Sequence, residues 1–385
     1  MQQFEFYNPV QIVFGEGQIA KLATLVPEKA RVLVLYGGGS IKKNGTYTEV
    51  MEALKNHSVA EFSGIEANPT YETMMKAVAQ IKAEKIDFLL AVGGGSVIDG
   101  TKFAAAAAVY EGDPWEIFTT GGQHIKAALP LGAVLTLPAT GSEMNNGSVI
   151  TRSEIKTKLP FMNRHVFPQF AILDPTKTYS LPARQIGNGA VDAFVHVVEQ
   201  YLTYPANAPV QDRFAESLLQ TLIEVGPQAL ATPHDYTVRS NLMWAATMAL
   251  NGLIGAGVPQ DWATHLLGHE LTALYNIDHA QTLAIILPSM LNVRRVAKRE
   301  KLLQYADRVW GIKEGTEDAR IDAAIAKTRD FFEAMGVKTR MRDYDLQPKA
   351  IEAVLEQLKA HGMVALGEHG DVDLATSKLV LEGSY

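Results

Sequence analysis

Cysteine is absent from the 385-residue chain. Disulfide bonds, thiolate nucleophiles and cysteine-ligated zinc sites are therefore all excluded. Any metal ion that the protein binds must be held by histidine and carboxylate side chains.

An excess of basic charge is also lacking. The chain has 35 lysine and arginine residues against 42 aspartate and glutamate residues, which gives a formal net charge of -7. Proteins that bind nucleic acids concentrate lysine and arginine on one face, where these side chains contact phosphates. We therefore expect no nucleic-acid partner.

Long hydrophobic segments and targeting signals are missing too. The first residues, MQQFEFYNPVQIVFGEG, do not show the basic start, apolar stretch and small-residue cleavage site of a signal peptide. The most apolar runs, such as Leu283–Leu291, are far shorter than the roughly 20 residues that a membrane span needs. These features predict a cytoplasmic protein without a membrane partner.

The length of the chain predicts two domains, because domains usually run to about 100–200 residues. In the first half, short apolar runs typical of buried parallel strands alternate with helical stretches. The expected strands are Arg31–Tyr36, Asp87–Val92, Leu131–Leu137 and Phe170–Leu173, and the expected helices include Pro69–Glu84 and Val97–Val109. Residues 1–180 are therefore predicted to form a Rossmann-like α/β domain with a parallel sheet.

From about Leu181 onward the β-branched runs give way to helix-forming residues, with apolar positions three and four apart. Proline and glycine separate the expected helices. These helices are Ala183–Leu202, Asp212–Glu224, Val238–Leu253, Asp261–Tyr275, His279–Lys298, Ile321–Met335 and Lys349–His361. Residues 181–385 are therefore predicted to form an all-helical domain.

Two glycine-rich segments directly follow predicted strands. Their sequences are Gly37-Gly38-Gly39-Ser40 and Gly93-Gly94-Gly95-Ser96. Glycines at the carboxyl end of a strand let the backbone approach a phosphate, and a helix N-terminus adds partial positive charge there. One such segment could equally be a tight turn without a ligand, but two after neighbouring strands favour a phosphate-bearing cofactor. Neither matches the GxGxxG or Walker A pattern.

The residues after Gly37 indicate which nicotinamide cofactor is preferred. Many NAD-selective sites place an acidic residue near this position, where it accepts the ribose 2′-hydroxyl group. This chain instead offers Ser40, Lys42 and Lys43, which tolerate or attract a 2′-phosphate. We expect NADP(H) to be preferred over NAD(H).

Histidines and an aspartate cluster in the helical half. Asp192 and His196 are four positions apart, on one face of a predicted helix, and His265 and His269 repeat this spacing. His279 follows at the start of the next predicted helix. Three or four of these side chains could bind one divalent metal, although an isolated helical histidine is more often a packed core residue or a surface group. Spacing alone does not select the ligands.

Four segments together resemble the iron-containing alcohol dehydrogenase family. They are GGGSVIDGTK at Gly93–Lys102, LPATGSE at Leu137–Glu143, the Asp192 and His196 pair, and the stretch from His265 to Ile285. Two further segments, at Tyr36–Ser40 and Gly252–His265, are similar to the butanol dehydrogenase and NADPH-dependent aldehyde reductase branch of this family.

The resemblance implies a dinucleotide-binding α/β domain, a helical metal-binding domain and an active site in the cleft between them. This architecture is similar to that of dehydroquinate synthase. The resemblance also implies a homodimer, and one hypothesis is that the N-terminal segments pair as edge strands.

Roles for individual residues also follow from the resemblance. One Fe²⁺ or Zn²⁺ ion would be held by Asp192, His196, His265 and His279. The cofactor would be bound by Gly37, Gly38, Gly39, Ser40, Gly93, Gly94, Gly95, Ser96, Thr136, Thr140 and Lys158. His269 would lie near the nicotinamide and the substrate. Asp99 is a further catalytic candidate near the nicotinamide, and the alternative is that it is a first-turn acid favoured by the helix dipole.

These parts predict a metal-dependent, NADPH-linked oxidoreductase that reduces aldehydes to primary alcohols and catalyses the reverse reaction. The cofactor supplies the hydride, the metal polarises the carbonyl oxygen, and His269 is the candidate proton donor. The substrate pocket could be walled by Phe161, Trp262, Leu266 and Tyr275, although these residues are equally typical of packing between helices.

Other functions stay open. A polyol dehydrogenase, or a lyase similar to dehydroquinate synthase that recycles its nicotinamide cofactor, would use the same architecture. The cluster of His265 and His269 alone would also suit a metallohydrolase, but Glu270 follows the second histidine, unlike the glutamate of HExxH. A non-catalytic binding protein would have lost a ligand or a glycine loop, and neither loss is seen.

Overall fold

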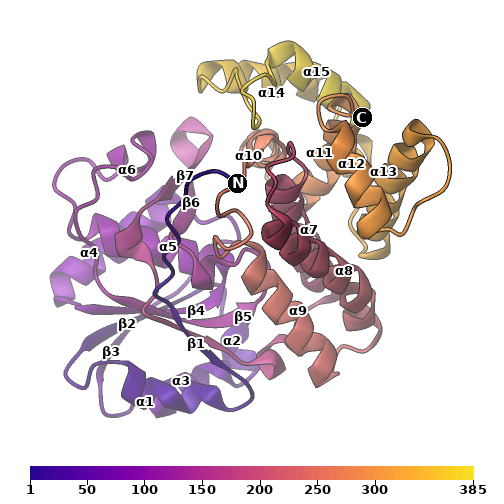
Figure 1. The fold of residues 1–385 in the computed structure, drawn as a ribbon. Coiled ribbons are helices and arrows are strands. Elements are labelled where there is room, and N and C mark those ends of the chain that lie inside the picture. Colours follow the sequence, from indigo (N-terminus) through magenta and orange to yellow (C-terminus); the bar gives the residue numbers. More distant parts are fainter. The chain divides into compact units, whose positions relative to one another are not determined.

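The computed structural model describes residues 1–385, which form two compact units. The α/β unit comprises residues 7–181 and 233–247, and the helical unit comprises residues 1–6, 182–232 and 248–385. Figure 1 shows the elements of both units along the chain. Each unit has a buried hydrophobic core of its own.

Two segments lie in a different unit from the one that the predicted domains gave them. Residues 1–6 belong to the helical unit, where the backbone N–H of Gln2 donates a 2.9 Å hydrogen bond to the carbonyl oxygen of Gly257. Residues 233–247 belong to the α/β unit, because Met243 enters its core and the ring of Trp244 contacts Phe14 edge-on. Contacts between residues far apart in the sequence cause both differences, and local patterns do not report such contacts.

Six parallel strands form the sheet of the α/β unit, in the order β1-β8-β5-β4-β2-β3. They are β1 (Gln11–Phe14), β2 (Arg31–Tyr36), β3 (Ser58–Phe62), β4 (Phe88–Gly94), β5 (Leu131–Leu137) and β8 (Phe170–Leu173). The predicted parallel α/β fold is therefore confirmed. The bounds of β2, β5 and β8 match the prediction, whereas β4 extends to Gly94, and β1 and β3 were not predicted.

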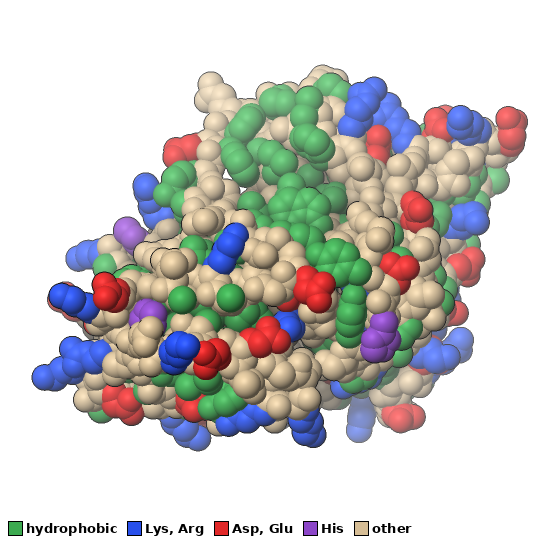
Figure 2. Space-filling model, turned by 90° about the horizontal axis from the view of Figure 1, so that it is seen from below, with side chains coloured by type: hydrophobic (Ala, Val, Ile, Leu, Met, Phe, Trp, Pro, Cys, Tyr) green, Lys and Arg blue, Asp and Glu red, His purple; other side chains and the backbone are tan.

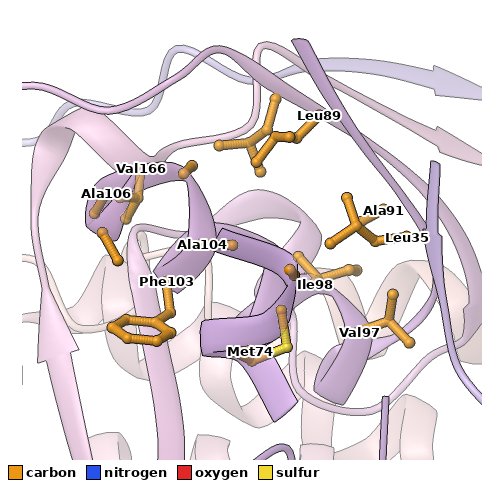
Figure 3. Close-up of a cluster of buried hydrophobic side chains, with 14 of the residues drawn as sticks. Leu35, Met74, Leu89, Ala91, Val97, Ile98, Phe103, Ala104, Ala106 and Val166 are labelled. Carbon is orange, nitrogen blue, oxygen red and sulfur yellow. The ribbon is translucent and has the colours of Figure 1, made fainter. Parts of the chain in front are cut away.

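Both faces of this sheet are buried. Leu35 and Ala91 point into one hydrophobic cluster, and their strand neighbours Val34 and Leu90 point into the other. The first face is covered by α4 (Tyr71–Glu84) and α5 (Gly95–Ala107), and the second by η1 (Gln18–Lys21), α1 (Leu22–Leu25) and α3 (Thr46–Ala53) (Figure 1). Figure 3 shows Met74 of α4 and Ile98 of α5 in the first cluster. This layering fixes α5 against the carboxyl end of the central strands.

Shorter elements connect these layers. They are α2 (Ser40–Lys43), α6 (Glu116–Thr119), η2 (Ser142–Met144), η3 (Ser153–Ile155), η4 (Arg164–Val166) and η5 (Pro175–Thr178). An antiparallel hairpin of β6 (Gly147–Arg152) and β7 (Thr157–Met162) packs beside α5.

The helical unit consists of α7 (Ala183–Tyr201), α8 (Pro209–Ala231), α10 (Ala263–Tyr275), α11 (His279–Val293), α12 (Arg299–Arg308), α13 (Glu317–Ala334), η6 (Met341–Tyr344), α14 (Lys349–Ala360) and α15 (Leu374–Gly383). The helical second half is thus confirmed, although α12 and α15 were not predicted. Most of α9 (Tyr236–Ala249) lies in the α/β unit. Helix α11 contacts both α7 and α10, so these three helices form a connected group.

Close packing holds α7 in place. A Cβ atom at Gly187 would lie 2.1 Å from the carbonyl oxygen of Met335, so only glycine allows α7 to approach the end of α13 this closely. The ring of Phe194, further along α7, lies 5.1 Å from the ring of Phe331. Both contacts stabilise the helix that carries Asp192 and His196.

None of the helices is both long and apolar enough to span a membrane. On the face shown in Figure 2, basic and acidic side chains are interspersed. No large surface of one charge sign is visible on that face.

Candidate functional site

The two glycine-rich segments leave the sheet side by side. Strands β2 and β4 are neighbours, with Tyr36 opposite Val92, so Gly37 and Gly93 emerge next to each other. Beyond them, β3 lies outside β2 and β5 lies outside β4, so the chain turns in opposite directions after the two strands. Open α/β sheets bind ligands at such a switch point, outside the carboxyl ends of the strands.

Packing within the chain explains some of these glycines and not others. A Cβ atom at Gly95 would lie 2.2 Å from Oγ1 of Thr140, and one at Gly94 would lie 3.0 Å from Cβ of Leu137. The end of β4 and the start of α5 therefore pack directly against the end of β5 and the loop after it. By contrast, a Cβ atom at Gly38 would meet nothing within 4 Å. Packing within the chain therefore does not require glycine at position 38, whereas a ligand bound close to the backbone would require it.

The other predicted cofactor residues lie at or near this edge of the sheet. Thr140 contacts the start of α5 beside Gly95, and Thr136 is the penultimate residue of β5. The Ser96 hydroxyl donates a hydrogen bond to the carbonyl oxygen of Ala67, and Nζ of Lys158 donates one to Oδ1 of Asn68 at 3.2 Å. The loop before α4 therefore brings Ser96 and Lys158 together.

Lys102 is a buried cation next to this edge, and no role was predicted for it. Its Nζ atom donates hydrogen bonds to Ser142 Oγ at 2.9 Å, Asn145 Oδ1 at 2.9 Å and the carbonyl oxygen of Gly147 at 2.8 Å. Burial lowers the pKa of Lys102 to about 8, although the charges of Asp99 and Glu143 act in the opposite direction. Lys102 thereby ties α5 to the loop after β5.

Asp99 lies beyond the first turn of α5, so the alternative that it is a first-turn acid is wrong. Its carboxylate accepts hydrogen bonds from the Ser142 hydroxyl and from the backbone N–H of Val149, the latter at 2.9 Å. Burial raises the pKa of Asp99, and the charge of Lys102 opposes this shift. The contacts of Asp99 favour a structural role, as a link between α5, the loop after β5 and strand β6.

Three elements of the helical unit bring the predicted metal ligands together. Asp192 and His196 lie on α7, His265 lies on the first turn of α10, and His279 is the first residue of α11. Ligand atoms of Asp192, His265 and His279 all lie within 4.8 Å of one another. The rings of His196 and His265 stack with their centres 4.7 Å apart. All four side chains therefore meet at one place.

This arrangement fits a divalent metal. Because metal–ligand bonds to nitrogen and oxygen are about 2.0–2.2 Å long, two ligand atoms of one ion lie no more than about 4.4 Å apart. Oδ1 of Asp192 lies 3.7 Å from Nε2 of His279 and 3.8 Å from Nδ1 of His196. Nδ1 of His196 is buried without a hydrogen-bond partner. Burial lowers the pKa of His196 to about 4, so its imidazole is neutral at pH 7, as a metal ligand must be.

Glu199 is a further residue of this site, and its part in the site was not predicted from the sequence. It lies on α7, three positions after His196, and its carboxylate forms a hydrogen bond with Nδ1 of His265. Burial raises the pKa of Glu199, the charge of Asp261 adds to the shift, and the backbone N–H groups of Thr264 and His265 oppose it. The position of Glu199 on the same helical face as Asp192 and His196 was a signal for it in the sequence.

His269 and Glu270 follow on α10 but have different surroundings. The ring centre of His269 lies 5.2 Å from that of His279, so His269 borders the group of predicted ligands. The carboxylate of Glu270 forms a 2.7 Å hydrogen bond with Nδ1 of His361 instead. The carboxylate of Glu270 is thus paired with a histidine that is not one of the predicted metal ligands.

Trp262, one of the four predicted pocket residues, lies beside two of the predicted metal ligands. The ring centre of Trp262 is 5.2 Å from that of His265 and 6.2 Å from that of His196. Its backbone has a φ angle of 65°, a left-handed conformation that is rare for a bulky residue and marks local strain. Phe161, by contrast, is buried in the core of the α/β unit, where it packs against Phe118.

Comparisons with known proteins agree with this geometry. The family model described as iron-containing alcohol dehydrogenase matches residues 9–175, and the model for the C-terminal part of the Fe-containing alcohol dehydrogenase family matches residues 187–367. The chain is 59% identical to the NADPH-dependent aldehyde reductase YqhD of Escherichia coli over the full length of both proteins. It is 43% identical to the probable NADH-dependent butanol dehydrogenase 1 of Bacillus subtilis, covering 94% of this chain and 95% of that protein.

Among solved structures, the crystal structure of YqhD from E. coli K-12 superimposes on this chain with a TM-score of 0.99. The two share 58% sequence identity, and the match covers 100% of this chain and 99% of the other. The resemblance inferred from the sequence segments is therefore confirmed.

The buried Lys102 makes stability depend on pH. Because its folded-state pKa of about 8 lies below the ordinary lysine value of 10.5, the folded chain binds fewer protons than the unfolded chain between these pH values. The free energy of unfolding therefore rises with pH across this window, by up to about 3 kcal/mol. In urea denaturation, the free energy of unfolding of the wild-type protein relative to that of Lys102→Met should be greater at pH 10 than at pH 8. An equal difference at both pH values would contradict this account of Lys102.

Proposed function

Because the chain belongs to the iron-containing alcohol dehydrogenase family, we propose that it is a metal-dependent enzyme that reduces aldehydes to primary alcohols with NADPH and catalyses the reverse reaction. The observation that carries this proposal is the meeting of Asp192, His265 and His279 in a chain 59% identical to an NADPH-dependent aldehyde reductase.

The proposed metal ligands are Asp192, His196, His265 and His279. Imidazole and carboxylate donors suit Fe²⁺ and Zn²⁺, and the family description favours iron. When bound, the metal supplies Lewis acidity toward a carbonyl oxygen, and NADPH supplies the hydride. One carboxylate with three neutral imidazoles leaves a divalent site with net positive charge, which suits the negative charge that develops on the oxygen.

The proposed cofactor residues divide by position. Gly93–Ser96 would hold the pyrophosphate at the N-terminus of α5, and Gly37–Ser40 would hold the adenosine ribose with its 2′-phosphate. Thr136, Thr140 and Lys158 would contact other parts of the cofactor.

The surroundings of Glu61 support a preference for NADPH. This acid belongs to β3, beside β2, and its carboxylate accepts 2.8 Å hydrogen bonds from the hydroxyl groups of Tyr36 and Tyr47. Nζ of Lys42 also lies 3.7 Å from Glu61, over the rings of both tyrosines. The carboxylate is therefore engaged within the chain, and a lysine stands beside the segment proposed to hold a 2′-phosphate.

His269 is the proposed proton donor to the developing alcohol. It is buried, and its ring lies next to that of His279. Histidine is the side chain that most often serves as a general acid or base in enzymes, which suits this role in aldehyde reduction. Trp262 is proposed to form a wall of the aldehyde site, because its indole ring lies beside two of the proposed ligands.

Cofactor oxidation tests the proposed reaction. Protein of known metal content should oxidise one NADPH for each butanal that it reduces. The reaction should be slower when NADH replaces NADPH. Neither cofactor should be consumed after the metal is removed by chelation. The loss of nicotinamide absorbance measures the reaction. If metal and NADPH are bound but no net oxidation occurs with any aldehyde tested, the result would contradict an aldehyde reductase and favour a lyase that recycles its cofactor.

Removal of single ligands tests the metal site. Asp192→Asn and His279→Ala should each lower metal affinity, because a direct bond to the metal is lost. The loss should exceed the roughly 10–100-fold that follows when a residue hydrogen-bonded to a ligand is changed. Metal content after dialysis, measured by atomic emission, checks this expectation. His124→Ala changes an exposed histidine of the α/β unit and serves as the control. Retention of one full metal equivalent by both ligand variants would exclude the proposed site.

We also propose that the chain forms a homodimer through the outer edge of β1. This strand pairs only with β8, so the backbone groups of its other edge are not used within the sheet. The side chain of Phe14 on β1 is 37% exposed, and that of nearby Tyr7 is 52% exposed. An edge strand of this kind with exposed aromatic side chains is a template for pairing with a second chain.

Light scattering coupled to gel filtration tests the dimer. The wild-type protein should have twice the chain mass of 42.0 kDa, and Phe14→Glu should shift the mass toward that of one chain, because a charge is placed at the paired edge. Val296→Glu changes a residue of the helical unit that is 81% exposed and should leave the mass unchanged. A monomeric wild-type protein rules the proposal out.

A further inference from the structure

Helix α7 presents a third polar side chain on the face that carries two of the proposed metal ligands. Asp192, His196 and Glu199 occupy positions i, i+4 and i+7, which lie on one side of an α-helix. All three side chains are buried. The burial of a carboxylate is unfavourable unless the group has hydrogen-bond partners or a counter-charge, so Glu199 must have such partners.

The hydrogen-bond partners of the Glu199 carboxylate all belong to the first turn of α10. Its carboxylate accepts hydrogen bonds from the backbone N–H of Thr264 at 2.7 Å and from that of His265 at 3.3 Å. It also forms a hydrogen bond with the ring atom Nδ1 of His265. One side chain of α7 thus holds both the backbone and the ring of a proposed ligand on another helix.

These bonds determine how His265 can bind a metal. A carboxylate accepts hydrogen bonds, so Nδ1 of His265 carries the proton and donates it to Glu199. Nε2 is then the atom with the lone pair, and His265 meets Asp192 and His279 in the proposed metal site. A partner at one ring nitrogen commonly fixes which nitrogen binds the metal and how the ring is oriented.

The start of α10 depends on the same carboxylate. The N-cap residue, Trp262, has a left-handed backbone and its side chain accepts no hydrogen bond from the helix. Oδ1 of Asp261 accepts from the backbone N–H of Ala263 at 3.0 Å, and Glu199 accepts from the next two N–H groups. Side chains outside the usual N-cap position therefore satisfy the helix end that positions His265.

A buried lysine offsets the acidic charge gathered here. Nζ of Lys298 lies 2.9 Å from Asp261 and 2.6 Å from Glu368, and it donates a hydrogen bond to the carbonyl oxygen of Leu202. Asp261 in turn lies next to Glu199, since its backbone N–H donates a 2.9 Å hydrogen bond to the carbonyl oxygen of Glu199. The acids around the first turn of α10 thus have a fixed counter-charge within the helical unit.

We propose that Glu199 is a positioning residue for the metal site, which fixes the tautomer and the ring orientation of His265 and thereby raises metal affinity. The inference rests on the metal site of the proposed function. Glu199 itself does not bind the metal in this proposal. When a residue that is hydrogen-bonded to a metal-binding histidine is mutated, metal affinity typically falls by about 10–100-fold.

The test compares metal binding by Glu199→Gln with binding by the wild-type protein, without aldehyde or cofactor. Glutamine keeps the size of the side chain, but it has one acceptor oxygen and its amide N–H₂ group faces other N–H donors. Competition with a chromophoric chelator for Co²⁺ should show about 10–100-fold weaker binding by the variant. The visible absorption of bound Co²⁺ should also shift, because the ring of His265 is no longer held in one orientation.

The matched control is Glu216→Gln. Glu216 is a buried carboxylate of α8 in the same unit, and it accepts hydrogen bonds from the Tyr201 hydroxyl at 2.9 Å and from Nε2 of Gln304 at 2.8 Å. It contacts none of the proposed ligands, so its loss should lower thermal stability and leave Co²⁺ affinity and absorption unchanged. A general effect of removing a buried carboxylate would appear in both variants.

Each outcome bears on the inference. A folded Glu199→Gln variant with wild-type Co²⁺ affinity and absorption would overturn it. If circular dichroism shows that this variant does not fold, Glu199→Asp keeps the charge but withdraws the carboxylate by one methylene group, and wild-type affinity in that variant has the same meaning. If the wild-type protein itself binds no metal, the metal site of the proposed function fails, and this inference fails with it.

Discussion

The helical unit depends on the buried polar face of α7. Asp192 and His196 are almost completely removed from solvent there, and Glu199 lies one turn further along the same face. Burying a carboxylate without a counter-charge costs several kcal/mol, so this face requires cations or donors opposite it. The start of α10 supplies donors to Glu199, and a divalent metal would supply the charge opposite Asp192. The same face therefore links the stability of the unit to the proposed chemistry.

Sequence patterns predicted the central strands because these strands are buried on both faces. Strands β2 and β5 consist almost entirely of apolar residues, and their predicted bounds match the structure. The edge strands β1 and β3 were missed, since most of their residues are exposed or half-buried and the apolar pattern is interrupted. Helix α8 was predicted to end at Glu224, before Gly226 and Pro227, but it continues through Pro227 to Ala231. Tertiary packing overrides such local stop signals.

The candidate site was predictable where its signals are local. The two glycine segments and the spacing of Asp192 and His196 need only a few neighbouring residues to be recognised, and a family resemblance selected His265 and His279. Glu199 was missed although it lies on the same helix, because its partner His265 is 66 positions away in the sequence. The identity of a hydrogen-bond partner depends on how α7 packs against α10, which no local pattern encodes.

Transfer of a deuterium label from the cofactor to the product tests the central claim most directly. The metal-loaded protein would be incubated with butanal and NADPH that carries deuterium at both C4 positions, and the butanol would be analysed by mass spectrometry. The account predicts one deuterium at C1 of every butanol molecule formed, and no labelled butanol from metal-free protein. Formation of unlabelled butanol, or labelled butanol at the same rate without metal, would contradict it.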